Sequence, residues 1–361
     1  MIIMEITKEL KPESELGKLP EDESTLEFGK IFTDHMFSMK YSETDGWYDA
    51  KVHPYGPISL DPAAIVFHYG QEVFEGLKAY RWEDGQINLF RPMKNLDRLN
   101  GSAERMVMPL IDKEFVLEAI KQLVEVEKDW VPHTPMTSLY IRPTYIGTQA
   151  KLGVQPSTDY LFYVILSPVG PYYASGFAPC KILVEEKYVR AAPGGVGFTK
   201  AGGNYAASLL AAKIAHDKGY TQVLWLDAAE KKYIEEVGTM NMFFVIDGTI
   251  VTPPLSSGSI LPGVTRDSII HIANAWGMSL EERPISIDEV ITASENGTLN
   301  EAFGTGTAAV VTPVGELCYK DSCITINDGQ VGSITQNLYD ELVAIQYGQK
   351  EDPYDWVVKI C

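Results

Sequence analysis

The stretch from Gly194 to Tyr205 reads G-G-V-G-F-T-K-A-G-G-N-Y and holds one lysine, Lys200, between two clusters of glycine. Glycine has no Cβ, so a glycine-rich backbone can pass close to a bulky ligand. A lysine amine attacks a carbonyl only when it is deprotonated, and partial burial in a crowded loop lowers the pKa of the amine by penalising its charged form. The stretch therefore predicts a nucleophilic lysine beside a cofactor, although a lysine taken alone is more often an exposed charge.

The residues around this stretch have the pattern of a compact sheet with helices. A strand is predicted from Lys181 to Val184, and a helix from Ala206 to His216, closed by Gly219. A further helix is predicted to begin within 262–267 and to run to Trp276. Two hairpins are also predicted: Val223 to Leu226 with Tyr233 to Glu235, and Met242 to Ile246 with Thr249 to Thr252 around the Asp247-Gly248 turn.

The first half of the chain mixes strands and helices. The apolar run from Leu161 to Leu166 predicts a strand, and the Pro/Gly-rich residues 168–173 that follow it are typical of a linker. Two more strands and two helices are predicted earlier: strands Ala63 to His68 and Gln86 to Phe90, and helices Met93 to Met106 and Lys113 to Trp130.

These patterns predict an α+β protein with two domains. A chain of 361 residues exceeds the usual size of a single domain, so two cores are expected. We expect a loosely held N-terminal arm at 1–25, a smaller N-terminal domain at 26–168, a linker at 169–180 and a larger C-terminal domain at 181–361.

The charge of the chain excludes two classes of partner. With 30 basic and 49 acidic residues the net charge is -19, so the surface repels nucleic-acid phosphates and anionic membranes. The stretch from Met1 to Glu5 turns polar and acidic at once, unlike a signal peptide, and no apolar run is long enough to span a bilayer. We therefore expect a cytoplasmic protein whose ligands are small molecules.

The four cysteines and six histidines do not form a recognisable metal motif. Cys180, Cys318, Cys323 and Cys361 are spread along the chain without C-x-x-C spacing, so neither a zinc site nor a disulfide framework is predicted. The histidines are scattered as well. We expect no metal, and a reducing cytoplasm fits this cysteine usage best.

The second half of the chain offers the groups that pyridoxal phosphate requires, namely an amine, amide donors for the phosphate and a carboxylate for the ring nitrogen. Gly263-Val264-Thr265 begins a predicted helix, whose free N–H groups suit a phosphate, and Gly306-Thr307-Ala308 forms a turn between two strands. Glu235 and Glu236 end a predicted strand. Because side chains alternate along a strand, we expect one carboxylate to point inward and the other to solvent.

In the first half, three features suit ligand binding. The residues 67–76 mix aromatic, acidic and glycine residues without periodicity, as binding loops do. Tyr140 and Arg142 lie two residues apart on a predicted strand and so share a face, where a phenol and a guanidinium can reach one carboxylate. Arg98 lies on a predicted helix, where an arginine is usually solvated or pairs with a nearby acid such as Asp97.

Taken together, seven blocks in order closely resemble the branched-chain aminotransferases, which belong to the fold-type IV pyridoxal phosphate enzymes. The resemblance runs from about Ser59 to Glu316. The blocks are F-H-Y-G-Q-E-V-F-E-G-L-K-A-Y from Phe67, N-L-F-R-P-M-K-N-L-D-R-L from Asn88, S-L-Y-I-R-P from Ser138, G-G-V-G-F-T-K-A-G-G-N-Y from Gly194, E-E-V-G-T-M-N from Glu235, L-P-G-V-T-R from Leu261 and F-G-T-G-T-A from Phe303. The family's fold implies an N-terminal α/β sandwich domain and a C-terminal pseudo-barrel domain that binds the cofactor.

The resemblance implies a role for each matching residue around the cofactor. Lys200 forms the covalent link to pyridoxal 5'-phosphate and moves the proton, Glu236 keeps the ring nitrogen protonated, and Tyr205 bonds the phenolic oxygen. Arg98 contacts the phosphate, and Arg190 resembles another arginine near it. The remaining cofactor-binding residues are expected to be Thr239, Gly263, Val264, Thr265 and Thr307.

The resemblance also implies a substrate pocket that serves an aliphatic and an acidic side chain in turn. Arg142 resembles the arginine that receives the side-chain carboxylate of glutamate, and the amides of Thr307 and Ala308 bind the α-carboxylate. The apolar pocket is expected to be lined by Tyr69, Phe74, Tyr140, Tyr172 and Met240. Family members are homodimers in which Tyr69 and the loop 151–154 reach the neighbouring active site.

The implied reaction is the reversible transfer of an amino group between L-leucine, L-isoleucine or L-valine and 2-oxoglutarate. Three other functions remain open: a D-amino acid aminotransferase or aminodeoxychorismate lyase of the same fold, a nucleotide-binding protein that uses the glycine-rich loop, and a family member that binds cofactor without catalysis. The loop does not match G-x-x-x-x-G-K-S/T, which disfavours the nucleotide-binding function. The sequence does not decide the substrate ranking, the direction, any assembly beyond a dimer, the role of the arm, or redox regulation.

Overall fold

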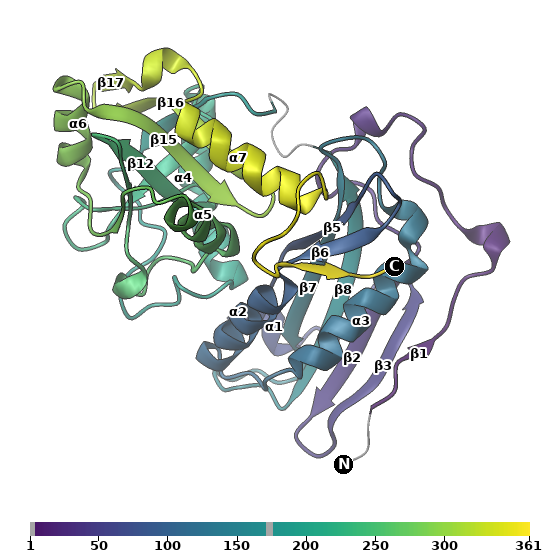
Figure 1. The fold of residues 1–361 in the computed structure, drawn as a ribbon. Helices are drawn as coiled ribbons and strands as arrows, with labels where there is room; N and C mark the ends of the chain where they lie inside the picture. Colours follow the sequence, from purple (N-terminus) through teal and green to yellow (C-terminus); the bar gives the residue numbers. More distant parts are fainter. Residues whose placement is uncertain (1–3, 171–175) are drawn as a thin grey trace. The chain divides into compact units, whose positions relative to one another are not determined.

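The computed structural model describes residues 4–170 and 176–361, which form two compact units (Figure 1). The first unit contains the described residues up to 170 together with Thr199–Gly202 and Ile345–Cys361, and the second contains the described residues up to Phe198 with Gly203–Ala344. Three separate segments of the chain therefore build the first unit, and Lys200 lies in the second of these segments.

The first unit is built on a nine-stranded sheet whose main order is β1-β3-β2-β8-β7-β5-β6-β18, with β4 paired to β7. Every pair is antiparallel except β1 with β3. The strands are β1 (Thr7–Lys8), β2 (His35–Ser42), β3 (Gly46–Pro54), β4 (Glu72–Phe74), β5 (Leu77–Arg81), β6 (Ile87–Phe90), β7 (Ser138–Gly147), β8 (Asp159–Val169) and β18 (Val357–Lys359).

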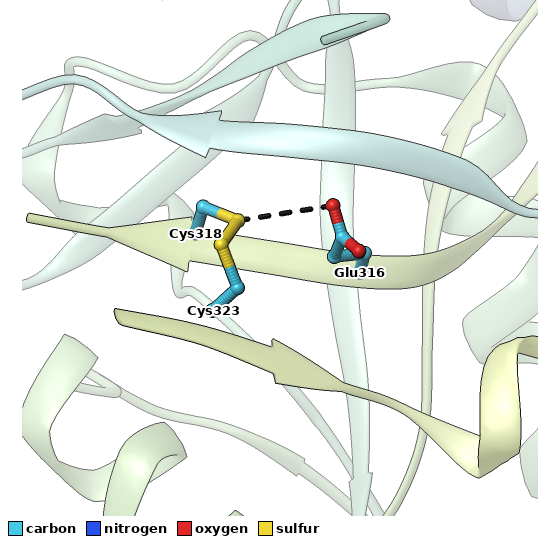
Figure 2. Close-up of side chains that lie close together, drawn as sticks. All are labelled: Glu316, Cys318 and Cys323. Atoms are coloured by element: carbon cyan, nitrogen blue, oxygen red, sulfur yellow. Dashed lines mark hydrogen bonds between the residues drawn. A yellow bond between two sulfur atoms is a disulfide. The ribbon is translucent and has the colours of Figure 1, made fainter. Parts of the chain in front are cut away.

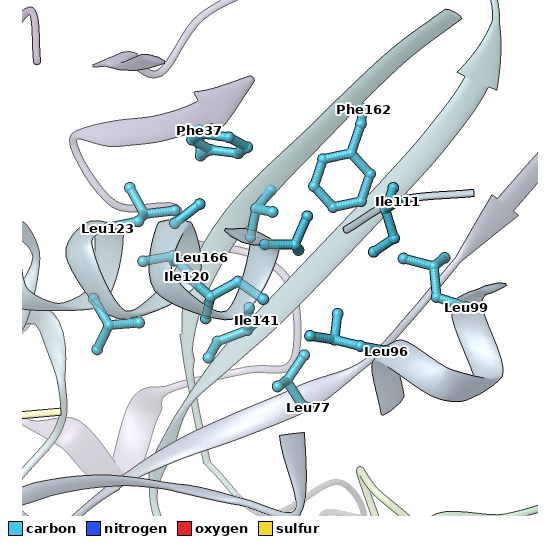
Figure 3. Packing of buried hydrophobic residues seen from close by; sticks show 14 of the residues in the cluster. Phe37, Leu77, Leu96, Leu99, Ile111, Ile120, Leu123, Ile141, Phe162 and Leu166 are labelled. Atoms are coloured by element: carbon cyan, nitrogen blue, oxygen red, sulfur yellow. The ribbon is translucent and has the colours of Figure 1, made fainter. Parts of the chain in front are cut away.

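Two helices, α2 (Pro92–Arg105) and α3 (Lys113–Val126), cover one face of this sheet and build the core of the first unit (Figure 3). The Asp112 carboxylate accepts a hydrogen bond from the Phe115 N–H and so caps the start of α3. Leucines and isoleucines at helical spacing on α2 and α3 pack against alternate residues of the strands, such as Ile141 and Leu166. The other residues of these strands face away from the helices, where the polar candidates of the first unit lie.

The second unit contains a closed ring of strands. Its sheet runs β11-β10-β9-β16-β15-β12-β13-β14 with β17 on β16, and an additional pairing of β11 with β12 joins six strands into a barrel. The strands are β9 (Cys180–Val184), β10 (Gln222–Leu226), β11 (Ile234–Val237), β12 (Met240–Ile246), β13 (Thr249–Thr252), β14 (Leu280–Glu282), β15 (Leu299–Gly306), β16 (Val310–Tyr319) and β17 (Ser322–Thr325).

The remaining elements of the described residues are four longer helices, one short helix and five 3-10 turns. They are α1 (Ile65–Tyr69), α4 (Gly202–Asp217), α5 (Val264–Ala275), α6 (Ile287–Glu295), α7 (Ser333–Gln346), η1 (Glu13–Glu15), η2 (Glu23–Thr25), η3 (Lys128–Trp130), η4 (Leu255–Ser257) and η5 (Asn327–Gly329). None of the helices in the described part of the chain has both the length and the apolar character that crossing a bilayer needs.

Most of the predicted elements are confirmed, including both hairpins of the second half. The strand predicted from Ala63 to His68 is wrong, because Ile65–Tyr69 forms a short helix that ends at Gly70 in the left-handed conformation. The predicted helix 113–130 ends at Val126 and continues as a 3-10 turn.

The unit boundaries differ from the predicted domain ranges at three places, one of which is Thr199–Gly202, predicted in the C-terminal domain but part of the first unit. The predicted C-terminal domain included residues 345–361, but β18 pairs with β6 of the first sheet. The predicted arm contributes β1, which pairs with β3, and Gly17, whose N–H donates a hydrogen bond to Asp34. Part of the predicted linker, 171–175, lies outside the described residues.

The absence of a disulfide is also a wrong prediction. Cys318 on β16 and Cys323 on β17 are direct cross-strand partners and are joined by a disulfide bond (Figure 2). The turn at Lys320 and Asp321 reverses the chain so tightly that residues five apart in sequence face each other. Spacing rules for metal and redox motifs do not include this arrangement.

Candidate active site

Lys200 is held in the first unit by two backbone hydrogen bonds. Its carbonyl accepts a bond of 3.0 Å from the Phe74 N–H at the end of β4, and its own N–H donates to Ser102 Oγ on α2 at 3.0 Å. The Nζ atom lies 4.9 Å from the centroid of the Phe74 ring. The amine is therefore fixed against an aromatic face between a strand and a helix.

The surroundings of Lys200 favour the neutral, nucleophilic amine. Burial of the ammonium is the largest cause, and the nearby positive charge of Arg98 acts in the same direction, so the pKa falls to about 8 even though Glu75 and Tyr140 oppose the shift. With this pKa, about a tenth of Lys200 is deprotonated at pH 7, far more than for a lysine with the ordinary pKa of about 10.4.

Labelling of Lys200 by an amine-directed reagent is expected to speed up about tenfold per pH unit until about pH 8 and then to level off. The cause is that the deprotonated fraction stops growing above the pKa of the amine. Peptide mapping by mass spectrometry of the cofactor-free protein between about pH 6 and pH 10 measures this rate. A lysine in a model peptide, with a pKa of about 10.4, is the control; a Lys200 profile parallel to that control contradicts the prediction.

Arg98 forms a two-armed ion pair with Glu75 and does not pair with Asp97. Its Nε and NH2 groups donate to the Glu75 carboxylate at 2.7 and 2.8 Å, and Asn95 adds a third bond at 2.9 Å. Asp97 instead binds Lys113. Burial opposes the ionisation of Glu75, but Arg98 and Asn95 outweigh it and hold the pKa of this fully buried carboxyl below its usual range.

Tyr140 and Arg142 share one face of β7, as predicted, and they contact each other. Arg142 NH2 donates to Tyr140 Oη at 3.1 Å, and the guanidinium lies 4.8 Å from the centroid of the Phe74 ring. Phe28 packs edge-on against Tyr140 with ring centroids 4.8 Å apart. This cluster combines an aromatic wall with a positive charge, and Arg142 and Tyr140 both act on the pKa of Lys200.

Gly76 makes room for Tyr140, since a Cβ at this position would lie 1.9 Å from Tyr140 Oη. Gly76→Ala is therefore expected to displace the Tyr140 ring and to lower kcat/KM by about 100-fold, the usual effect of misplacing a group at the chemistry by an ångström. Steady-state kinetics measures this loss. Gly101→Ala on α2 is the matched control, because its added Cβ meets nothing within 4 Å; equal activity of the two variants contradicts the prediction.

Two polar residues on the same sheet face as Tyr140 were missed by the sequence analysis. Lys78 on β5 and Ser167 on β8 are the cross-strand partners of Tyr140, one on each side. Both are buried, the Ser167 hydroxyl has no hydrogen-bond partner among the described residues, and burial lowers the pKa of Lys78 to about 8. The sequence did contain a signal, because Lys78 stands between the apolar residues Leu77 and Ala79. Side-chain alternation along the strand places Lys78 on the opposite face from these two, which is the face of Tyr140.

Glu236 lies in the second unit with its carboxylate already engaged. Its Oε1 accepts a hydrogen bond of 2.7 Å from the Leu261 N–H and lies 3.2 Å from Arg190 NH2. Arg190 NH2 also donates to the carbonyls of Gly197 and Ser259, while its Nε has no partner among the described residues. Arg190 therefore places a positive charge beside the Glu236 carboxylate and keeps its Nε donor available.

The prediction that one of the two neighbouring glutamates faces solvent is wrong, because Glu235 and Glu236 are both buried. The segment that follows η4 covers them, with Ser259 Oγ donating to Glu235 and the Leu261 N–H donating to Glu236. Burial is the main reason that the pKa of Glu235 is raised. Side-chain alternation holds here, but both faces of this strand are covered.

A small cavity brings together four of the predicted cofactor residues, Arg190, Tyr205, Glu236 and Thr239. Asn204, Ser208 and Gly238 complete its lining. Tyr205 comes from the first turns of α4, and Thr239 from the turn between β11 and β12. The cavity thus places a phenol, a carboxylate and a guanidinium around one space.

The predicted phosphate site begins at the N-terminus of α5. Gly263 is the N-cap residue and has no side chain to occupy the first free N–H groups of Val264 and Thr265. A Cβ on Gly263 would lie 2.0 Å from Asn241 Oδ1, so the backbone and this amide side chain are in close contact. The positive end of α5 therefore stays open to an anion.

A row of polar side chains crosses three strands of the barrel beside this helix end. Glu236, Asn241 and Thr305 are successive cross-strand partners on β11, β12 and β15 and so share one face. The buried Thr305 hydroxyl has no hydrogen-bond partner among the described residues. An unsatisfied buried hydroxyl near a helix N-terminus fits a bound phosphate oxygen, which would accept its hydrogen bond.

The other predicted residues are placed as follows. Thr307 and Ala308 lie in the turn between β15 and β16, directly after Thr305 and Gly306. Met240 packs in the hydrophobic core of the barrel, on the opposite face of β12 from Asn241. Tyr69 is exposed at the end of α1, and Tyr172 lies outside the described residues.

Comparison with known proteins identifies the family. Residues 72–317 match the family model described as amino-transferase class IV. The chain is 54% identical over 360 residues to branched-chain-amino-acid aminotransferase 2 of Bacillus subtilis (strain 168), covering 100% of this chain and 97% of that protein. It is 57% identical over 340 residues to branched-chain-amino-acid transaminase 1 of the same organism, covering 94% and 95%.

Solved structures agree with these relatives. The Escherichia coli branched-chain amino acid aminotransferase superposes with a TM-score of 0.76 at 28% identity, covering 91% of this chain and 99% of that chain. A branched-chain amino acid aminotransferase of T.th., crystallised with pyridoxamine 5'-phosphate, gives a TM-score of 0.73 at 26% identity, with 90% and 98% covered. The predicted family and two-domain α+β fold are confirmed. The chain belongs to the class IV aminotransferases and, among them, to the branched-chain aminotransferase family.

Proposed function

We propose that this aminotransferase moves an amino group reversibly between L-leucine, L-isoleucine or L-valine and 2-oxoglutarate, giving branched-chain 2-oxo acids and L-glutamate. The observation that supports it most is the cluster of Phe74, Tyr140 and Arg142 beside Lys200. Aromatic rings suit an aliphatic side chain, and the guanidinium suits the distal carboxylate of glutamate. One face of the first unit thus carries groups for both substrates.

The cofactor is pyridoxal 5'-phosphate, which supplies a carbonyl for the amine and a ring that accepts electrons. Lys200, with its pKa of about 8, takes the proton from the substrate Cα and returns it. Glu236 would hold a positive charge at the ring nitrogen, and Arg190 NH2 lies 3.2 Å from its carboxylate. The phosphate is held by the N-terminus of α5 with Thr305 and Thr307, together with Arg98 by the family resemblance.

The remaining proposed roles follow the family resemblance. Tyr205 and Thr239 line the cavity beside Glu236 and bind the cofactor, while Thr307 and Ala308 bind the substrate α-carboxylate through their N–H groups. Tyr69, Tyr172 and Met240 complete the apolar pocket. Met240 packs in the hydrophobic core of the barrel, so this role requires that the same core residues also line the pocket.

The absorbance spectrum of the purified protein with pyridoxal phosphate tests this function. L-Leucine is expected to convert the bound cofactor to its amine form, and 2-oxoglutarate to restore it. A cofactor band that ignores L-leucine and responds to D-alanine would favour a D-amino acid aminotransferase of the same fold. Absence of any band, with tight binding of ATP, would favour the nucleotide-binding function.

We also propose that the chain is a cytoplasmic homodimer. Exposed apolar side chains gather near α1, namely Phe67 and Tyr69 on the helix and Leu152 and Val154 on the neighbouring loop. The Lys151 N–H donates to the Ala63 carbonyl and ties this loop to the start of α1. Such a patch is costly to leave in water, and a second copy would cover it.

Sedimentation analysis tests the dimer. The expected mass is twice the 40.1 kDa of the chain, and Val154→Asp is expected to shift it toward the monomer, since this side chain is 88% exposed. A monomeric wild-type protein at micromolar concentration contradicts the proposal. A cell-fractionation experiment that finds the chain outside the cytoplasm would contradict the proposed location.

A further inference from the structure

The disulfide between Cys318 and Cys323 is chemically asymmetric (Figure 2). Cys318 is only 1% exposed, whereas Cys323, on the edge strand β17, is exposed to solvent. The two sulfur atoms of one bond therefore differ in access. A thiolate that approaches from solution meets the Cys323 sulfur first.

Charge adds to this asymmetry. The Glu316 carboxylate lies beside the buried sulfur, with Oε1 at 3.8 Å from Cys318 Sγ, and its other oxygen lies 3.5 Å from Lys181 Nζ. A negative carboxylate repels an incoming thiolate at Cys318. At the exposed sulfur the contact is a hydroxyl and not a carboxylate, since the Tyr220 Oη lies 4.0 Å from Cys323 Sγ.

The hairpin does not depend on the disulfide for its pairing. β16 and β17 also pair through Glu316 with Thr325 and Leu317 with Ile324. Leu317 belongs to the hydrophobic core of the barrel, which anchors β16 from the other side. Opening the bond thus leaves the two cysteines side by side on an intact hairpin, ready to close again.

We propose that Cys323 is a modification site for small-molecule thiols, and that Cys318 is the resolving cysteine. In the reducing direction a thiolate attacks Cys323 Sγ, a mixed disulfide forms, and the bond to Cys318 breaks with Cys318 leaving as a thiolate. A second thiolate then attacks the mixed disulfide, which releases the symmetrical small disulfide and leaves Cys323 as a thiolate. Two electrons pass from the two small thiols to the protein.

Glu316 has a defined part in this exchange. Once the bond opens, Cys318 takes a proton from solvent, and the resulting thiol can donate a hydrogen bond to the Glu316 carboxylate that lies within reach. In the disulfide the same sulfur has no proton to donate. The carboxylate therefore stabilises the open form and makes the bond easier to reduce.

Two variants, each lacking one cysteine of the pair, test the assignment, and both are made in a Cys361→Ser background that removes the other exposed thiol. Each full-length protein is incubated with glutathione disulfide, quenched with acid and mapped by mass spectrometry. Cys318→Ser is expected to accumulate a glutathione adduct on Cys323, because no resolving thiol remains. Cys323→Ser is expected to gain adduct on Cys318 at least about tenfold more slowly, because that thiol is buried beside a carboxylate.

The parent protein provides a measurement without changing either cysteine of the pair. In mixtures of glutathione and its disulfide, the adduct is expected on Cys323 at intermediate ratios and the internal disulfide at oxidising ratios. Equal adduct rates in the two variants, or an adduct on Cys318 in the parent, would overturn the proposal. Circular dichroism confirms that each variant is folded before the rates are compared.

Discussion

Lys200→Ala is expected to lose transamination almost entirely, with kcat lower by on the order of 10⁴-fold. The variant removes the amine that is held against the Phe74 ring with a pKa of about 8, which is the group proposed to move the proton at the substrate Cα. The measurement is single-turnover conversion of L-leucine to its 2-oxo acid in protein loaded with cofactor. Retention of the cofactor by the variant is compatible with this result, since the phosphate contacts persist.

Lys213→Ala is the matched control for Lys200→Ala. Lys213 lies on α4 in an exposed ion pair with Asp217, and such pairs contribute little to stability. Its removal takes away the same charge without touching the predicted site. Normal turnover in Lys200→Ala, or an equal loss in Lys213→Ala, would rule out the assigned role of Lys200.

The second large effect is expected for Glu236→Gln, with kcat falling about 100-fold or more and KM changing less. Glutamine keeps the shape of the side chain and can still accept the hydrogen bond from the Leu261 N–H, but it removes the negative charge that faces Arg190. In the proposed mechanism this charge would hold the ring nitrogen of the cofactor protonated, and the variant would lose it. Steady-state kinetics with L-leucine and 2-oxoglutarate separates the two parameters.

Glu235→Gln is the neighbouring control. Burial raises the pKa of Glu235 and so disfavours its charge, which makes a neutral amide a mild substitution at this position. Its expected effect on kcat is small, because Glu235 accepts a hydrogen bond from Ser259 and does not line the cavity that Glu236 lines. An unchanged kcat in Glu236→Gln would remove that residue from the mechanism.

The sequence predicted the parts of the fold that local chemistry determines. Asp247-Gly248 marked the hairpin of β12 and β13, and Gly219 marked the end of the helix that became α4. The resemblance then supplied Lys200, Glu236, Tyr205 and Arg190, of which the last three line one cavity with Thr239. These predictions depended on residues close together in the chain or on whole motifs.

The misses at Glu235 and Arg98 share a cause, which is that segments distant in the sequence decide the environment of a residue. Glu235 and Glu236 are both buried because the segment around Ser259 covers them. The partner of Arg98 is Glu75, and the strands β5 and β6 separate these two residues in the sequence. The disulfide depends on a turn geometry that no spacing motif encodes. The positions of Lys78 beside Tyr140 and of Thr305 beside Asn241 follow from side-chain alternation, but only after the pairing of the strands is known.

The first unit is discontinuous in the chain, and this affects how the protein can be made. Its sheet receives its last strand, β18, from residues 357–359, so the sheet is complete only after these residues have left the ribosome. The segment Thr199–Gly202 must likewise dock on β4 and α2 after the chain has begun the second unit. Separate expression of two halves cut near residue 170 would strand Lys200 on the wrong fragment. We therefore expect the first unit to form fully only in a chain that carries all three of its segments.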